Sequence, residues 1–524
     1  MTEQTKVKTL EKVVIRFSGD SGDGMQLTGT IFSNLSAVFG NEISTFPDYP
    51  AEVRAPQGTL SGVSGFQVHL GSRKIFTPGD KADVLVAMNP AALKVNVKNI
   101  KSNAIVLIDT DSFTKADLTK ALYTTDDPFT ELGLTGVQVV AAPISTMVKD
   151  GLVEFGLDNK SALRCKNMFA LGLVCWLFER PLDEAMHMLQ NKFAKKPVIA
   201  QANIKALTDG YNYGHNIHAS VSTYRIESKK AEPGFYTDVN GNKATAYGLI
   251  AAAEKSGLQL FLGSYPITPA TDILHELAKR KDLGVITVQA EDEIAGISTA
   301  IGASFAGCLA CTSTSGPGLA LKSEAIGLAV IAELPLVVID VQRGGPSTGL
   351  PTKSEQTDLM QALYGRNGEC PAVVVAASTP TDCFDAAYWA CKLAVEHMTP
   401  VILLSDAFIA NGSSAWRIPE LENYPEIIPN YVSNYHEDKP WKPYRRDKES
   451  FVRYWAVPGT EGFMHRLGGL EKDFDTSAIS TDPENHQKMV STRQAKIDKI
   501  ADYIPGLQVY LKIGRAVQQE CRDR

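Results

Sequence analysis

The sequence predicts an α/β protein built from two domains in which strands and helices alternate. Two observations carry this prediction. Over the first 110 residues, short apolar runs of strand type such as VVIRF (13–17) and AIVLID (104–109) are separated by helical or glycine-rich stretches. A second alternating run begins near residue 243, and its strands are continuously apolar, which is typical of parallel sheets covered on both faces.

The composition of the chain excludes several functional classes. The chain has 524 residues, 44% of them hydrophobic, and a net charge of −7. An acidic chain without a basic patch is not typical of nucleic-acid binding. The N-terminus lacks the apolar core of a secretory signal, and no apolar run is long enough to span a membrane. Eight scattered cysteines favour a reducing compartment. We therefore expect a cytoplasmic protein without nucleic-acid or membrane partners.

The first domain is expected over residues 1–226. Its most distinctive segment is the loop FSGDSGDGMQ (17–26), which follows an apolar strand and precedes a helical pattern. Such a loop can bind phosphate through its backbone N–H groups. Its tripeptide Gly22-Asp23-Gly24 also begins a known metal–diphosphate motif. The loop is therefore a candidate cofactor site on pattern alone.

Three further segments complete the predicted organisation. The polar stretch 227–242 interrupts the periodicity and is predicted to be a linker to the second α/β domain, 243–410. Residues 411–511 are rich in proline, aromatic and charged residues, and we expect a connecting arm followed by the start of a C-terminal α/β domain, with a strand at 507–511. Residues 512–524 back-translate to a common sequencing-adapter read. We expect them to be an artefact and the C-terminal domain to be truncated.

Four segments of the second domain are expected to line one crevice. Each combines the end of a strand with a loop, and the carboxyl ends of parallel strands lie at one edge of a sheet. They are GSYPITPATD (263–272), AEDEIAGISTAIGA (290–303), TSTSGPGLALKSE (312–324) and DVQRGGPSTGLPTKSEQTD (340–358).

The residue types in these segments suit the binding of an anionic substrate and a ring nitrogen. Two prolines fix the backbone around Thr268, whose hydroxyl can donate to a carbonyl or carboxylate oxygen. Arg343 leaves a strand into a glycine-rich loop, and guanidinium pairs bidentately with carboxylates. Three acids at 291–293 open a helix of small residues, where one carboxylate can share a proton with a ring nitrogen. Helix capping and a structural arginine are the alternatives.

Two other patterns in this domain lack residues that a ligand site needs. TSTSGPGLALKSE resembles an NTP-binding loop, but Leu321 stands where a glycine should precede the lysine. The alternative is a Gly-Pro-Gly turn whose N–H groups face the crevice. Cys308 and Cys311 form a CxxC without the further cysteines of an iron–sulfur or zinc site. We expect two small buried residues and no metal site in this chain.

The four segments closely resemble the α part of 2-oxoacid:ferredoxin oxidoreductases, which are thiamine diphosphate enzymes. Residues 13–230, with the glycine loop and YPAEVRAP (49–56), resemble the γ domain of that family. The resemblance covers about residues 13–511 and implies a γ-type domain fused to a pyrimidine-type parallel-sheet domain. QRGGPSTGLPTKSEQ and GLEKDFDTS resemble the 2-oxoglutarate branch most closely. Pyruvate or branched-chain 2-oxoacids are the alternative substrates.

The resemblance implies roles for individual residues. Thr268 matches a threonine that contacts the 2-oxoacid, and Arg343 matches the arginine that binds its carboxylate. Glu293 matches the glutamate that hydrogen-bonds the aminopyrimidine ring of the cofactor. The Gly-Pro-Gly turn is expected to supply two further cofactor contacts, through Ser315 and Gly316. Lys353 and groups on the partner subunit are the alternative candidates for binding the distal carboxylate of 2-oxoglutarate.

The resemblance also implies that this chain holds half of an active site. In thiamine enzymes the Gly-Asp-Gly motif needs an asparagine about two dozen residues downstream to complete the Mg²⁺ site, and this chain reads DYPAEV there. The loop at 17–26 is therefore predicted to bind no cofactor diphosphate, and contact with coenzyme A or a partner stays open. Thiamine diphosphate is expected to be shared with a β subunit that carries Mg²⁺ and a [4Fe–4S] cluster, with coenzyme A as co-substrate and ferredoxin as acceptor.

Two hypotheses that assign the chain to other functional classes remain open. A nucleotide-binding redox protein would use the loop at 17–26 alone, but its glycines at 19, 22 and 24 do not follow the GxGxxG spacing. An inactive scaffold or fragment is the second, because of the expected truncation.

Overall fold

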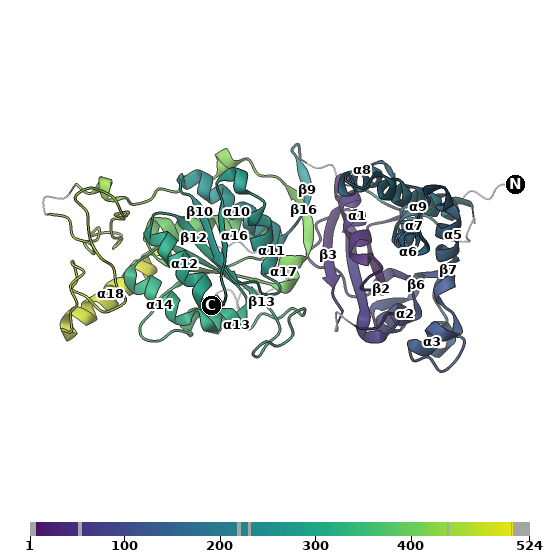
Figure 1. The fold of residues 1–524 in the computed structure, drawn as a ribbon, viewed down its shortest axis with the longest axis horizontal. Helices are drawn as coiled ribbons and strands as arrows, with labels where there is room; N and C mark the ends of the chain where they lie inside the picture. The colour runs from purple at the N-terminus through teal and green to yellow at the C-terminus, as the bar shows by residue number, and fades with distance from the viewer. Residues whose placement is uncertain are drawn as a thin grey trace.

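The computed structural model describes most of the chain as two α/β domains and a C-terminal arm (Figure 1). The residues described are 7–50, 55–216, 222–228, 232–436, 440–504 and 506. The expected strand at 507–511 and the expected artefact at 512–524 lie outside the described residues. In the described part, no helix is long and apolar enough to cross a bilayer.

The first domain is built on an eight-stranded mixed sheet in the order β7-β6-β5-β2-β4-β3-β16-β9. The strands β2, β5, β6 and β7 are parallel to one another, whereas β4, β3, β16 and β9 add antiparallel neighbours. The bounds are β2 Lys12–Asp20, β3 Glu42–Asp48, β4 Val63–Gly71, β5 Ala82–Ala87, β6 Ile100–Asp109, β7 Gln138–Ala142, β9 Tyr236–Asn240 and β16 Ser413–Arg417.

Helices cover this sheet and bury its apolar residues. The helix α7 is apolar on nearly all sides, and it lies buried between the sheet and its neighbour α9. A small two-stranded sheet pairs β1 Lys8–Leu10 with β8 Tyr224–Ile226. The helices are α1 Met25–Val38, α2 Pro90–Asn96, α3 Lys115–Lys120, α4 Pro128–Glu131, α5 Ile144–Gly151, α6 Asn159–Leu163, α7 Lys166–Leu177, α8 Asp183–Lys192 and α9 Pro197–Asn216.

The second domain has a six-stranded sheet that is parallel throughout, in the order β11-β10-β12-β13-β15-β14. This confirms the predicted α/β fold. The strands are β10 Leu260–Ser264, β11 Ile286–Gln289, β12 Leu309–Thr314, β13 Leu336–Gln342, β14 Val373–Ala376 and β15 Pro400–Asp406. Successive side chains alternate between two cores on opposite faces, which explains the uniformly apolar strands.

Helices cover both faces of this second sheet. One core packs beneath α10, α11 and α16, and the other beneath α12, α13, α14 and α15. Their bounds are α10 Gly241–Ser256, α11 Thr271–Ala278, α12 Glu293–Phe305, α13 Gly316–Leu321, α14 Ser323–Ala332, α15 Leu359–Tyr364, α16 Asp382–His397 and α17 Ala407–Asn411.

The junction between the domains differs from the expected linker. Residues 236–240 form β9, which pairs with β16 from the far end of the second domain. Through Ser414 opposite Ser44, β16 joins the first sheet at β3, and Ser33 donates a hydrogen bond to Asp238 (2.6 Å). Figure 1 shows β9 and β16 standing between the domains. The Pro-Gly pair at 233–234 favoured a linker. The strand that follows it, β9, has only five residues, which is too short for periodicity to predict it.

The arm packs back onto the second domain. In the described part of 418–482 it contains short 3₁₀ turns and isolated bridges, and it ends in α18 Pro483–Ile500. Val452, Trp455 and Ile500 join the core of the second domain. The buried Glu333, after α14, accepts from Arg446 (2.5 Å) and Lys496 (3.0 Å). The arm is therefore held by apolar burial and by a buried ion cluster.

Candidate active site

The predicted site residues come from consecutive strand ends of the second sheet. Thr268 follows β10, Glu293 begins α12 after β11, Ser315 follows β12, and Arg343 follows β13. Because these strands are parallel, their carboxyl ends form one edge. The first direct contact across it joins Arg343 to Thr268, as Nη1 donates to the Thr268 carbonyl oxygen at 2.7 Å. The structure thus brings together the four segments that the sequence singled out.

Arg343 is held in place and keeps one unused donor. Its Nη2 donates to the carbonyl oxygen of Thr348 (2.9 Å), while its buried Nε has no hydrogen-bond partner among the described residues. Burial lowers the pKa of the guanidinium, and the nearby Glu293 carboxylate opposes that shift. A buried donor without a partner is costly, so the arrangement suits an anionic ligand. The backbone of Thr268, rather than its hydroxyl, makes this contact.

One of the three acids at the start of α12 is its N-cap. It is Asp292, whose Oδ1 accepts from the Ala295 N–H at 2.7 Å, while Glu293 lies in the first turn of the helix. A Cβ built on Gly318 would clash with Thr314 Oγ1 and would lie 2.9 Å from Glu293 Cγ. The second glycine of the Gly-Pro-Gly turn therefore lies close to the side chains of both Thr314 and Glu293.

The first glycine of the same turn makes room for another acid. A Cβ on Gly316 would lie 2.5 Å from Oδ2 of Asp358. Burial, and then the Asp358 carboxylate, raises the pKa of Asp340, a fully buried residue of β13. Next to the turn, the hydroxyl of Ser315 is buried and has no partner among the described residues. Sequence reasoning missed the acid pair, since the two acids are 18 positions apart.

Lys322 is a second missed residue. It is fully buried, and its Nζ donates to the Glu293 carbonyl oxygen at 2.7 Å. Burial lowers its pKa to about 8, although Glu293 and Asp292 act in the opposite direction. A buried lysine at an acid-led helix is typical of functional sites. The signal lay in the segment TSTSGPGLALKSE, where the lysine was considered only as part of an NTP-binding loop.

Lys353 lies at the junction with the first domain. Its Nζ is 3.0 Å from Oδ1 of Asp48, whose Oδ2 is 2.6 Å from the buried Arg16. The Lys353 carbonyl oxygen accepts from the Gly344 N–H (2.9 Å), so its backbone lies beside Arg343. The side chain contacts Asp48 rather than the Arg343 guanidinium.

The glycine loop of the first domain is occupied by its own acids. Asp23 accepts from the Asp20 N–H (3.0 Å) and pairs with Lys166 (3.0 Å), while Asp20 accepts from the Gly58 N–H (2.9 Å). Burial, and then the nearby Asp23, raises the pKa of Asp20. Two carboxylates in this loop disfavour an anionic ligand, and the absence of a diphosphate there stays a prediction.

The two cysteines of the CxxC motif lie at the start of β12 and are at least half-buried. Cys311 is buried on β12, as expected, and its thiol lies 3.4 Å from the Phe261 carbonyl oxygen. Cys308 precedes the strand and is half-buried. Burial raises the pKa of both thiols, so neither has the character of a reactive thiolate.

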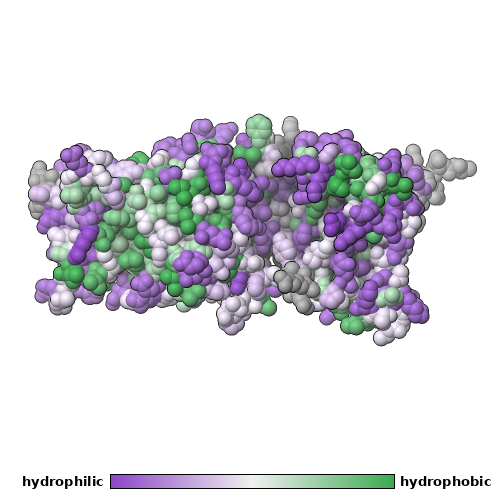
Figure 2. Space-filling model, in the orientation of Figure 1, coloured by the Kyte–Doolittle hydropathy of each residue, from purple (hydrophilic) through white to green (hydrophobic). Residues whose placement is uncertain are grey.

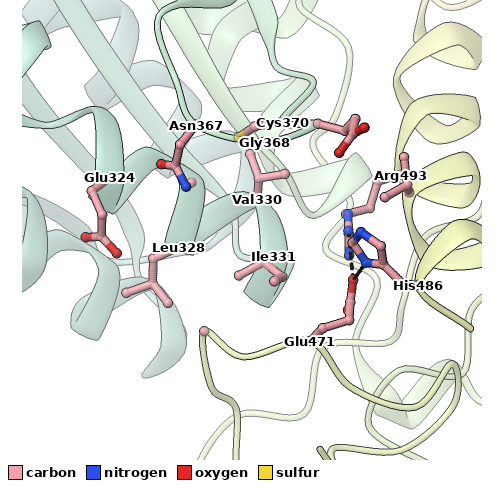
Figure 3. Close-up of a pocket in the computed structure, with 14 residues that line it drawn as sticks. Glu324, Leu328, Val330, Ile331, Asn367, Gly368, Cys370, Glu471, His486 and Arg493 are labelled. Carbon is pink, nitrogen blue, oxygen red and sulfur yellow. Dashed lines mark hydrogen bonds and ion pairs between the residues drawn. The ribbon is translucent and has the colours of Figure 1, made fainter. Parts of the chain in front are cut away.

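A cavity of about 300 Å³ lies elsewhere, between α14, the loop at 367–370 and α18 (Figure 3). Figure 3 shows His486 and Arg493 converging on Glu471, and their distances to Oε2 are 2.8 and 3.2 Å. No residue of the strand-end site lines this cavity.

The strand-end site fits one end of thiamine diphosphate. The Glu293 side chain lies near Gly318, and the unpartnered Ser315 hydroxyl lies beside the same turn. The buried Nε of Arg343 is a donor without a partner among the described residues. No cluster of three or more histidine, cysteine or acidic residues that could hold a metal ion occurs among the described residues.

Comparisons with known proteins match both domains. A family model described as pyruvate flavodoxin/ferredoxin oxidoreductase, thiamine diphosphate-binding, matches residues 252–479, and one described as pyruvate ferredoxin/flavodoxin oxidoreductase matches residues 14–213. The 2-oxoglutarate oxidoreductase subunit KorA of Mycobacterium tuberculosis is 52% identical over 95% of this chain and 76% of its own length. The 2-oxoglutarate synthase subunit KorA of Archaeoglobus fulgidus is 37% identical over 50% of this chain and 66% of its own length.

A solved structure extends the match to three dimensions. It is the 2-oxoglutarate:ferredoxin oxidoreductase from Magnetococcus marinus with 2-oxoglutarate, coenzyme A and succinyl-CoA bound. The TM-score is 0.82 and the identity 32%, with 96% of this chain and 82% of that chain covered.

Proposed function

The chain belongs to the family of 2-oxoacid:ferredoxin oxidoreductases, and on that premise we propose that it is the α subunit of a 2-oxoglutarate:ferredoxin oxidoreductase. The reaction converts a 2-oxoacid and coenzyme A to acyl-CoA and CO₂ and passes two electrons to ferredoxin. The observation that carries the proposal is the proximity of Glu293 to the incompletely bonded Arg343, whose pKa the Glu293 carboxylate raises against the effect of burial.

The residues of this chain bind, orient and move a proton. Two carbonyl oxygens fix the plane of the Arg343 guanidinium, which leaves Nε to meet the substrate carboxylate. Fixing the donor before the substrate arrives reduces the entropy lost on binding. Glu293 would accept and return a proton at the aminopyrimidine ring nitrogen. Thiamine diphosphate, when bound, supplies the carbanion and the electron sink for decarboxylation.

The site needs a partner subunit for the rest of the cofactor. Large apolar side chains are exposed around its edge, and Figure 2 shows apolar residues gathered over the second domain on the face in view. Exposed apolar residues in a group are typical of an interface. We infer that a β subunit with Mg²⁺ and a [4Fe–4S] cluster covers this edge. The exposed residues are Ile294, Leu321, Leu350, Leu359, Met360 and Tyr364.

Lys353 is proposed to bind the distal carboxylate of 2-oxoglutarate. Its partner Asp48 also pairs with the buried Arg16, so Asp48 keeps a counter-ion when Lys353 moves to a substrate. The backbone contact with Gly344 holds Lys353 near Arg343, at the other end of a short dicarboxylate.

The experiment measures coenzyme A-dependent reduction of methyl viologen by the complex with its partner subunit. The substrates are 2-oxoglutarate, pyruvate and 3-methyl-2-oxobutanoate. We expect kcat/KM for 2-oxoglutarate to exceed kcat/KM for the other two substrates by about tenfold or more.

Arg343→Ala should raise KM for 2-oxoglutarate at least tenfold. The control is Arg366→Ala, which should leave KM unchanged, because the hydrogen bonds shown for Arg366 go to backbone carbonyl oxygens. A preference for pyruvate would replace the proposed substrate, and no turnover with any 2-oxoacid would overturn the proposal.

A further inference from the structure

A further cavity, of about 510 Å³, lies in the first domain beside the end of α1. Three segments line it: the residue that follows α1, the connection between α7 and α8, and β8 with the two residues after it. The first segment contributes the aromatic ring of Phe39, and the second contributes the guanidinium of Arg180. We call this space the Arg180 cavity.

Arg180 is a buried cation without an acidic partner among the described residues. Only 2% of its surface is exposed. Its Nη2 donates to the amide oxygen of Asn41, and its guanidinium lies 4.6 Å from the centre of the Phe39 ring. Its buried Nε has no hydrogen-bond partner in the described part of the chain. A buried charge without a counter-ion is strongly destabilising, so an anion that enters the cavity would be bound favourably.

The two acids that line the Arg180 cavity do not supply this counter-ion. Glu179 accepts from Nη2 and Nε of Arg225 at 2.8 and 3.1 Å, so these two charges cancel. Glu227 is exposed, and its backbone carbonyl oxygen accepts from Nδ2 of Asn41 at 3.2 Å. This bond leaves the amide oxygen of Asn41 for Arg180. The buried end of the cavity is therefore positive.

The walls beside the guanidinium are apolar. Phe178 and Ile226 are buried, whereas Phe39 is 44% exposed although the Arg180 cation lies over its ring. Guanidinium groups bind carboxylate and phosphate oxygens through charge-assisted hydrogen bonds, and an aromatic ring favours a planar or apolar group beside it. These two features together suit a small organic anion with an apolar body.

We propose that the Arg180 cavity binds such an anion, with a carboxylate or phosphate group on Arg180 and a planar or apolar body against Phe39. The site is separate from the strand-end site. The strand β3 begins next to Asn41 and ends at Asp48, which pairs with Lys353. Its seven residues place the two sites about 20 Å apart. The proposal does not rest on the proposed function.

The test measures the binding of benzoate, phenyl phosphate and inorganic phosphate to the complex with its partner subunit, by titration calorimetry. All proteins carry Arg343→Ala, so that the strand-end arginine contributes no anion site. We expect saturable binding of an aromatic probe, and Arg180→Gln should raise its Kd at least about tenfold. The matched control is Arg417→Gln on β16, which removes an exposed arginine paired with Glu232 (3.1 Å) and should leave Kd unchanged.

A second variant keeps the proposal testable if Arg180→Gln does not fold. Asn41→Asp replaces the amide oxygen that accepts from Arg180 by a carboxylate oxygen. The cation then has an internal counter-ion, and Kd for the probe should rise by a similar factor. Phe39→Ala should weaken the binding of phenyl phosphate and leave that of inorganic phosphate unchanged, because only the first probe has a ring.

The probes also distinguish the two kinds of anion. Tighter binding of benzoate supports a carboxylate ligand, and tighter binding of phenyl phosphate supports a phosphate ligand. Three results would overturn the proposal: no saturable binding of either aromatic probe at millimolar concentration, an equal Kd in Arg180→Gln and its parent, or equal affinity for phenyl phosphate and inorganic phosphate.

Discussion

Two glycines of the Gly-Pro-Gly turn allow other side chains to approach it closely. Gly318 accommodates Thr314 and Glu293, and Gly316 accommodates Asp358. Each glycine is needed for the space beside it and not for an unusual backbone angle, because neither has a positive φ. The packing of the Glu293 side chain therefore depends on a glycine from another helix.

Gly318→Ala tests this dependence. The added Cβ would clash with Thr314 Oγ1 and would lie 2.9 Å from Glu293 Cγ, so the side chains of Thr314 and Glu293, or the turn itself, must shift. We expect kcat to fall about tenfold or more and unfolding free energy to fall by about 1–3 kcal/mol. The control is Gly302→Ala, where an added Cβ on α12 meets nothing within 4 Å. Equal kcat for Gly318→Ala and the unmodified protein would contradict this dependence.

Burying the charged Lys322 lowers the free energy of unfolding, and the size of this effect depends on pH. Its folded pKa, about 8, lies below its ordinary value of 10.5, so the unfolded chain binds this proton more tightly. The destabilisation is complete below about pH 8, where the lysine is charged in both states. It disappears as the pH rises towards 10.5, because the folded protein then holds the lysine neutral. Lys322→Met should therefore raise the unfolding free energy at pH 7 by about 1–3 kcal/mol, with a smaller gain at pH 10. Thermal melts at the two pH values measure this. A gain independent of pH, or a loss at pH 7, would contradict the assignment.

The sequence was sufficient to predict which segments lie at the strand ends. It was not sufficient to predict the contacts that their residues make with neighbouring helices. Parallel topology places strand ends together, which predicted that the segments holding Arg343 and the acids at 291–293 would meet. The choice of Glu293 among those acids came from the family resemblance. The burial of Lys322 and of Asp340 could not be predicted, because it depends on elements distant in sequence. The hydroxyl role expected for Thr268 stays a prediction, since the structure shows only its carbonyl in contact.

At the scale of elements, a buried acid is the centre of the ion cluster that helps to hold the arm. Glu333 accepts from Arg446 and Lys496, and Arg453 donates to its backbone carbonyl oxygen at 3.0 Å. The cations hold the pKa of Glu333 below its usual value of 4.5 despite full burial. This element could not be predicted, because the sequence of the arm shows proline and aromatic residues but no periodicity.

Glu333→Gln should detach the arm. The change leaves buried cations without their counter-ion, and breaking a buried pair typically costs about 3–5 kcal/mol. Because the folded pKa is lowered, the contribution is present above about pH 4.5 and is lost as pH falls below it. Limited proteolysis of residues 418–482 and melts at pH 7 and pH 3 measure both effects. The control Glu484→Gln changes an exposed acid at the start of α18. Unchanged stability of Glu333→Gln at pH 7 would contradict the account.

At the scale of the whole molecule, the two domains share a sheet. The strands β9 and β16 leave the second domain and extend the sheet of the first, while Lys353 and Asp48 join the substrate loop to β3. The sequence predicted the two α/β runs correctly, but it assigned β9 to a linker. Pairing between strands separated by more than 170 residues leaves no local pattern. The domain bounds proposed from sequence divide a continuous sheet.

We propose that this chain supplies, through Glu293, the proton-transfer carboxylate of a site shared with its partner subunit. The most direct measurement is the hydrogen-exchange rate at the thiazolium C2 of thiamine diphosphate bound to the complex, in the unmodified protein and in Glu293→Gln. We expect exchange to fall at least about 100-fold in Glu293→Gln, while the complex assembles and binds the cofactor. Asp292→Asn, which changes the N-cap next to it, should keep rapid exchange. Equal exchange rates in Glu293→Gln and the unmodified complex would contradict the account.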